Sequence, residues 1–525
     1  MNSGENQKSG QSRLRMLLAL PVAMIILMWP MFYNGQAFFY PDTSAYIRGV
    51  DAGVVALTGH QSLWSTDILF HEAQPETVQR LEKSPVTSAE STSTLSSQSP
   101  QSSVKSIKEK IVLSGRSVYY GALLYISSFD NRFWLTVIVQ VFLVVIALLL
   151  TLQSCELFTP FRVVAVVALL ALTALPLFVS FLMPDVFTSL VLLSCANFLA
   201  VRKSWNIWVF GFWFSLLSFS LLIHFSHVLL AVCFVALSLI LMVLRRGKVN
   251  TAGVLAISAA LFIAYAGNSA FETAVQKFAG NPPIRPPFLT ARMIADGPGY
   301  HFLLDTCPDS GYTMCRFMNL LSDTVDSNDI LWNSDPKIGI FTLADPVTRR
   351  AFSAEDYRFA AAVLRYDFIG QVVASVSNVA QQFFMIGTRE LQYSDTRRHY
   401  FARKLPANVY AMMSDTPAFR GIIPNGLFTI LNYAITIIGL AGLVWILTAQ
   451  RATITKFPGP VVPLVAWLMV GVFANTVLCG AVSDPVHRYG ARVAWLFPFA
   501  AMLLFYVLNT ESRRQPEVFT LCSTV

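Results

Sequence analysis

Two aspartates follow a proline at the edge of an apolar segment. Asp42 comes soon after the first hydrophobic segment, behind Pro41, and Asp185 follows Pro184. A carboxyl group near an apolar surface either has its pKa raised by desolvation or keeps its charge by binding a cation or hydrogen-bond donors. Either state suits a general base that takes a proton from a hydroxyl group. Both aspartates also stand where a helix can begin, so a simple helix-capping role is the alternative for each.

The segment 483–492 places two arginines one helical turn apart. Arg488 and Arg492 would share one helix face, and Arg492 would lie about 6 Å further along the axis, inside the apolar zone. An unpaired arginine there is costly, so the sequence predicts an anionic partner, either a phosphate or an internal carboxylate such as Asp42 or Asp185. Snorkelling to the membrane surface explains Arg488 well and Arg492 poorly.

Two histidines form a third candidate group. His224 and His227 are three residues apart and share a face if their turn is helical. The chain has no H-E-x-x-H pattern, which favours hydrogen-bonding or substrate-contact roles over a zinc site. A divalent metal stays open as a cofactor. The chain also lacks the G-x-x-x-x-G-K-[ST], G-x-G-x-x-G and D-x-D motifs, so the usual signature of a soluble nucleotide site is missing.

The composition indicates a multi-pass membrane protein. The chain has 525 residues, is 54% hydrophobic and only 13% charged, whereas a soluble domain carries about 25% charged residues. Its net charge of +8 falls in short clusters between apolar segments, which is typical of cytoplasmic loops and argues against a nucleic-acid partner. Cys307 and Cys315 are the only cysteine pair in a predicted external loop, so we expect a disulfide there in an oxidising compartment.

These elements predict an all-α bundle of about ten transmembrane helices with both termini cytoplasmic. The segment 368–386 repeats polar residues every three or four positions and is predicted to lie at the outer interface without spanning. With that assignment the basic clusters fall inside, which fits a bacterial inner membrane. The predicted spans are 16–33, 132–152, 161–182, 185–201, 205–223, 226–244, 252–270, 423–447, 460–480 and 490–508.

This topology divides the chain and gathers its candidate residues on the external side. The long first loop carries interfacial helices around a Ser- and Thr-rich insert, predicted to be disordered. The predicted parts are a cytoplasmic N-terminus (1–15), a first transmembrane helix (16–33), an external loop (34–131) with the insert 84–106, a six-helix membrane region (132–270), an external module (271–422), a three-helix membrane region (423–508) and a cytoplasmic tail (509–525).

The layout resembles the GT-C superfamily of membrane glycosyltransferases, which includes protein O-mannosyltransferases and the lipid A aminoarabinose transferase. The resemblance covers the membrane part and is carried by four short motifs. They are Tyr40–Tyr46 after the first span, Gly115–Leu124 before the second, Met183–Phe187 at a span start, and His487–Tyr489 followed by Pro498. The resemblance implies a sugar donor linked to polyprenyl phosphate, transfer on the external face, and Asp42 as the catalytic base.

Glycosyl transfer needs a base for the acceptor hydroxyl and a stabiliser for the departing phosphate. Our hypothesis gives the first role to Asp42 and the second to Arg488 and Arg492, with His487. Asp185 would orient the acceptor, which is a lipid, a glycan or a protein, or bind a metal. The remaining predicted substrate contacts are Tyr46, Arg116, Tyr119, Tyr120, His224 and His227.

Two rival functions remain. A transporter or flippase of a lipid-linked or anionic solute predicts charges spread through the bundle and internal repeats, and neither is evident in the sequence. A non-catalytic assembly factor would use the module 271–422 to bind a partner, and Asp42 and Arg492 would then be replaceable.

Overall fold

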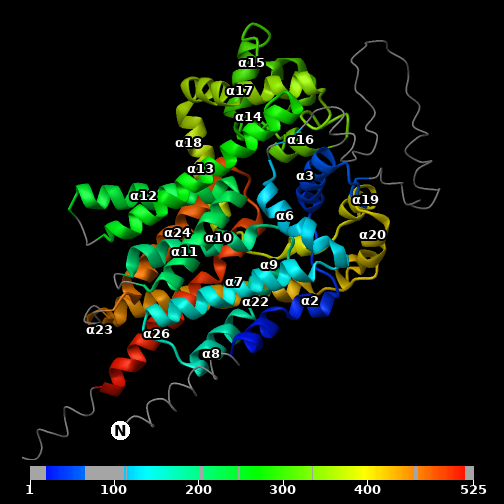
Figure 1. Cartoon of the computed structure of the whole chain (residues 1–525). Helices are drawn as coiled ribbons and strands as arrows, with labels where there is room; N and C mark the ends of the chain where they lie inside the picture. The colour runs from blue at the N-terminus through cyan, green and yellow to red at the C-terminus, as the bar shows by residue number, and fades with distance from the viewer. Residues whose placement is uncertain are drawn as a thin grey trace, which may run out of the picture.

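The computed structural model describes residues 19–65, 112–113, 115–201, 205–245, 249–333, 335–454 and 459–514. Within these ranges the secondary structure is helical, with two isolated β-bridges and no strand (Figure 1). The predicted insert 84–106, the N-terminus 1–15 and residues 515–525 of the predicted tail lie outside the described residues.

Helix α10 (Asp185–Ala200) forms the centre of the bundle. All 16 of its residues are buried. Apolar side chains lie on every side of this helix, so it has no polar face to turn to water. It packs against α11 (Ile207–Ile223), α12 (Phe225–Val243), α13 (Thr251–Ala279) and α24 (Val461–Val482). The N-terminal end of this central helix carries Asp185 into the protein interior.

Six described helices are long and apolar enough to cross a membrane. They are α7 (Trp134–Ser154), α12, α13, α22 (Asn425–Ala449), α24 and the continuous stretch His487–Thr510, which joins α25 (His487–Ala494) to α26 (Leu496–Arg514). A seventh is obtained if α17 (Pro346–Tyr366) and α18 (Phe368–Phe384), bent by 108°, count as one span. The helical membrane architecture is therefore confirmed, and the number of ten spans stays a prediction.

The segment predicted as one span over 161–182 is broken. Helix α8 ends at Leu170 and α9 covers only Leu175–Val179. Distant side chains satisfy two backbone groups at this break: Trp29 Nε1 donates to the Ala171 carbonyl, and the Ala174 N–H donates to Asn432 Oδ1 over 2.8 Å. Such a break is stable at membrane depth only where the protein supplies hydrogen-bond partners.

The polar stripe of α18 faces the protein. Gln371 and Asn378 donate to Asp296, and the Gln382 amide makes hydrogen bonds with both backbone atoms of Val486. The apolar side of the helix is exposed, with Ile369 at 70%. This arrangement is the reverse of a helix in water and is typical of a helix that faces lipid.

The region 271–422 contains two structural parts. Residues 284–363 have their own hydrophobic core, built by α14 (Phe288–Ala295), α15 (Pro298–Thr306), α16 (Ser327–Trp332) and α17. We call residues 284–363 the upper module. A disulfide joins Cys307 to Cys315 within it. By contrast α19 (Asp395–Lys404), α20 (Ala407–Ser414) and α21 (Pro417–Arg420) pack into the main core beside α3 (Pro41–Thr58).

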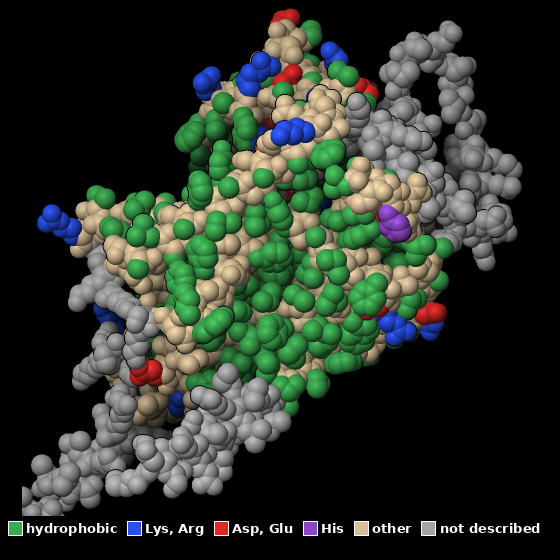
Figure 2. All heavy atoms as spheres, viewed as in Figure 1, with side chains coloured by type: hydrophobic (Ala, Val, Ile, Leu, Met, Phe, Trp, Pro, Cys, Tyr) green, Lys and Arg blue, Asp and Glu red, His purple; other side chains and the backbone are tan. Residues whose placement is uncertain are grey.

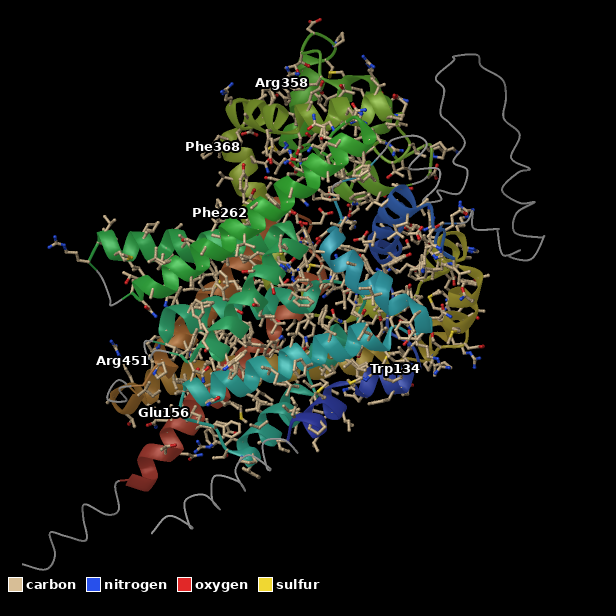
Figure 3. All side chains as sticks on the ribbon, in the orientation of Figure 1. Trp134, Glu156, Phe262, Arg358, Phe368 and Arg451 are labelled. Atoms are coloured by element: carbon tan, nitrogen blue, oxygen red, sulfur yellow. A yellow bond between two sulfur atoms is a disulfide. The ribbon has the colours of Figure 1, made fainter. Side chains whose placement is uncertain are left out.

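The surface separates apolar and charged regions. Figure 2 shows a broad hydrophobic face between charged groups at the top and at the lower left. Glu156 and Arg451 lie at the lower left, Trp134 lies at the opposite end of the bundle, and Arg358 lies in the upper module (Figure 3). The C-terminal helix α26 points away from the upper module (Figure 1). The upper module and the end of α26 thus lie on opposite sides of the molecule (Figure 1).

Candidate functional site

Asp42 lies in the first turn of α3 and not at its cap. The N-cap is Tyr40, whose backbone N–H donates to the Thr43 hydroxyl over 3.0 Å, and Pro41 starts the helix. The alternative helix-capping role for Asp42 is therefore excluded, because the rigid proline fits the first helical position and moves Asp42 one residue further in. The Asp42 carboxylate accepts a hydrogen bond from Arg116, which precedes α6 (Val118–Ser127).

Asp185 lies at the centre of a buried arginine cluster. Arg492 Nη1 donates to Asp185 Oδ1 over 3.2 Å, and Arg488 Nε lies 3.6 Å from the same oxygen. Arg492 Nη2 also donates to Asn475 and contacts Cys479 on α24. The predicted anionic partner of Arg492 is therefore the internal carboxylate Asp185. Pro184 is the N-cap of α10, so the charge of Asp185 serves the arginines.

The Tyr40 ring lies between two arginines, one from α25 and one from α19. The Arg488 guanidinium lies 4.2 Å from the centre of the Tyr40 ring, and that of Arg397 from α19 lies 5.1 Å from it. Cation–π contacts hold arginine side chains without using their N–H donors. Among the described residues, Arg488 Nε and Nη1 and Arg492 Nε are buried and donate no hydrogen bond. Arg488 Nε still faces Asp185 Oδ1 in an ion pair, so Arg488 Nη1 and Arg492 Nε are the two atoms of this set without a described partner.

Two buried tyrosines fill the space between the pairs. Tyr46 and Tyr120 contact each other edge to face, 5.3 Å between ring centres, and the Tyr120 hydroxyl donates to Gln140. Burial raises the pKa of Tyr46, whose hydroxyl interacts electrostatically with Asp42, Arg116, Asp185 and Arg488. Tyr46 therefore stays protonated, and the groups that surround it form one cluster.

The two histidines have separate hydrogen-bonding roles. His227 is fully buried; its Nδ1 donates to the Ser220 carbonyl, so its Nε2 accepts from the Thr188 hydroxyl over 2.9 Å. His224 is the N-cap of α12, and its Nδ1 accepts from the Ser226 N–H. The rings lie 5.1 Å apart. In this arrangement both ring nitrogens of His227 make hydrogen bonds. His224 interacts electrostatically with Arg492, Arg116 and Arg488.

Two predicted contacts lie elsewhere. The Tyr119 hydroxyl donates to the Gly267 carbonyl on α13, and His487 Nδ1 accepts from the Gly387 N–H. Neither has a described interaction with Asp42 or Asp185. The structure therefore brings together Asp42, Asp185, Tyr46, Arg116, Tyr120, His224, His227, Arg488 and Arg492, and leaves Tyr119 and His487 outside this group.

No group of three His, Cys, Asp or Glu side chains that could hold a metal is found in the described ranges. Asp42 and Asp185 each face an arginine instead. Within the described residues of the cluster, three guanidinium groups meet two carboxylates, which leaves one positive charge. Such a cluster is suited to bind an anion beside a carboxylate base.

Sequence reasoning missed several contributors. Tyr40, Asn475 and Cys479 contact Arg488 or Arg492. Arg397 lies over the Tyr40 ring, and Trp332 of the upper module contacts Arg116. A polar asparagine within the apolar segment 460–480 was the one signal available for Asn475. Comparisons with protein-family models, curated proteins and solved structures found no match to this chain.

Proposed function

We propose that this protein is a membrane glycosyltransferase of the GT-C type, which moves a sugar from a polyprenyl-phosphate donor to an acceptor hydroxyl. The supporting observation is the buried Arg488–Arg492 pair, which shares one carboxylate, keeps unused N–H donors and lies close to Asp42. We place this site at the external face of a bacterial inner membrane, with both termini inside.

In the proposed reaction the acceptor oxygen attacks the anomeric carbon of the donor sugar. The bond from that carbon to the phosphate oxygen breaks, and Asp42 takes the proton of the acceptor hydroxyl. Negative charge develops on the departing phosphate. Arg488 and Arg492 are held by Asp185, Tyr40 and Asn475 before substrate arrives, so they stabilise this charge with little reorganisation.

The charge of the cluster fits this donor. A sugar linked to polyprenyl phosphate is a phosphodiester with one negative charge, and the described cluster carries an excess of positive charge. Arg116 holds the Asp42 carboxylate from the side of α6 and orients it. Asp185 neutralises one of the two deep arginines, which lowers the cost of burying both.

A donor panel tests this proposal. Purified protein in nanodiscs would be given radiolabelled polyprenyl-phosphate sugars and crude membrane acceptor, together with the variant Arg488→Gln. We expect one donor to support transfer or hydrolysis, and the variant to bind that donor at least tenfold more weakly. Donor binding without any turnover would favour a transporter. The absence of both binding and turnover would overturn the proposal.

A further inference from the structure

The upper module contacts both arginine–carboxylate pairs. On one side, Trp332 at the end of α16 lies with its ring centre 5.4 Å from the Arg116 guanidinium, which pairs with Asp42. The Ile284 N–H donates to the Val112 carbonyl over 2.8 Å, which ties the start of the module to the chain just before Arg116. Arg116 is therefore held between Asp42 and the module.

On the other side, the module holds the turn that leads into α25. Asp484 in this turn accepts hydrogen bonds from Arg292, Ser327 and Asn328 of the module. Arg292 is itself fixed by Asp296, which also accepts from Gln371 and Asn378 of α18. The module therefore fixes the position of Asp484, four residues before Arg488 in the chain.

The same turn is fixed at its second end. The buried Gln382 side chain donates to the Val486 carbonyl over 3.1 Å and accepts from the Val486 N–H over 3.0 Å. Helix α25 begins at the next residue and presents Arg488 and Arg492 to Asp185. Because Asp484 and Val486 are both held by hydrogen bonds, the first turn of α25 has little freedom to move.

We infer that Trp332 and Arg292 are positioning residues, through which the upper module sets the geometry of the two arginine–carboxylate pairs. Trp332 fixes Arg116, and thereby the base Asp42. Arg292 fixes Asp484, and thereby the phosphate-binding Arg488. The catalytic consequences rest on the proposed transferase function, whereas the contacts themselves are testable without activity.

The first test measures arginine reactivity in the full-length protein in detergent. Phenylglyoxal would be added to wild type, Trp332→Leu, Trp332→Phe, Arg292→Gln and Arg285→Gln, and peptide mass spectrometry would give the rate at Arg116 and Arg488. Arg285→Gln is the matched control, because Arg285 pairs with Asp356 inside the module. Trp332→Phe keeps an aromatic face for the guanidinium.

We expect Trp332→Leu to raise the Arg116 rate at least fivefold, and Trp332→Phe to restore it to within twofold of wild type. Arg292→Gln should raise the Arg488 rate at least fivefold, and Arg285→Gln should leave both rates unchanged. Unchanged rates in both test variants would overturn the inference, as would equal effects of Arg292→Gln and Arg285→Gln.

The second test separates the two contacts kinetically once a donor is known. Trp332→Leu should lower kcat about tenfold with the donor affinity within twofold of wild type, because it disturbs the base. Arg292→Gln should weaken donor binding about tenfold, because it disturbs the phosphate site. Equal loss of both parameters in both variants would indicate general damage and overturn the division of roles. An inactive wild type would instead contradict the transferase proposal and leave the labelling test decisive.

Discussion

The two ion pairs of the site should differ sharply in their energetic coupling. Asp185 and Arg492 have side chains only 4% and 3% exposed, whereas Asp42 and Arg116 are 24% and 21% exposed. Removing one partner of an isolated buried pair costs about 3–5 kcal/mol, and here Arg488 stays beside Asp185 when Arg492 is removed, which reduces that cost. Pairs with more solvent contact contribute about 0.2–1 kcal/mol. We therefore predict a coupling of about 2 kcal/mol for the first pair and below about 1 kcal/mol for the second.

Two double-mutant cycles measure this difference. The variants are Asp185→Asn, Arg492→Gln and their combination, with the corresponding changes at Asp42 and Arg116 as the comparison cycle. Unfolding in mixtures of dodecyl sulfate and mild detergent, followed by tryptophan fluorescence, gives the free energy of unfolding of each variant. The combined Asp185–Arg492 variant should cost clearly less than the two single changes together. Additive costs for that pair, or a larger coupling at the comparison pair, would refute the assignment of the deep ion pair.

Further predictions concern stability. Burial lowers the pKa of Lys404 from 10.5 to about 8. Because the folded state loses this proton at a lower pH than the unfolded state, the free energy of unfolding should rise between pH about 8 and 10.5. Thermal unfolding at pH 7 and 9.5 should show a smaller rise for Lys404→Met than for wild type. A Cβ at Gly480 would lie 2.6 Å from the backbone of α18, whereas one at Gly442 would make an ordinary contact at 3.8 Å. Gly480→Ala should therefore lower the free energy of unfolding by about 1–3 kcal/mol, and Gly442→Ala should lower it much less. Equal melting temperatures of the two variants would contradict this packing. Peptide mapping without reductant should find Cys307 linked to Cys315, and free thiols at both positions would contradict it.

The sequence predicted those parts of the site that follow from the free-energy cost of burying a charged side chain in the membrane. An arginine at membrane depth needs an anionic partner, and the sequence left a phosphate or an internal carboxylate open for Arg492. The structure shows the carboxylate of Asp185. The polar stripe of 368–386 was also visible from its period, but not which way it faced. Its partners Asp296 and Val486 are 75 to 104 residues away in the chain, so the local sequence pattern carries no information about them.

The remaining differences also have local physical reasons. The hydrophobicity of 161–182 predicts one helix, yet Asn432 from a distant span supplies the hydrogen bond that allows the chain to turn at Ala174. A capping role for Asp42 was plausible because aspartate is a preferred N-cap residue. In the structure Pro41 is the first residue of the helix, so Tyr40 is the N-cap. The contact of Trp332 with Arg116 depends on how the upper module packs, which no short motif encodes.

The rate of sugar transfer by Asp42→Asn tests whether Asp42 is the catalytic base. This change keeps the size of the side chain and removes the proton acceptor. With the active donor in nanodiscs, we predict a loss of transfer of at least about 10²-fold, with donor binding within twofold of wild type because Arg488 and Arg492 are intact. Asp395→Asn, on an exposed side chain, serves as the control and should transfer at the wild-type rate. Transfer by Asp42→Asn at the wild-type rate would contradict the role of Asp42 as the base.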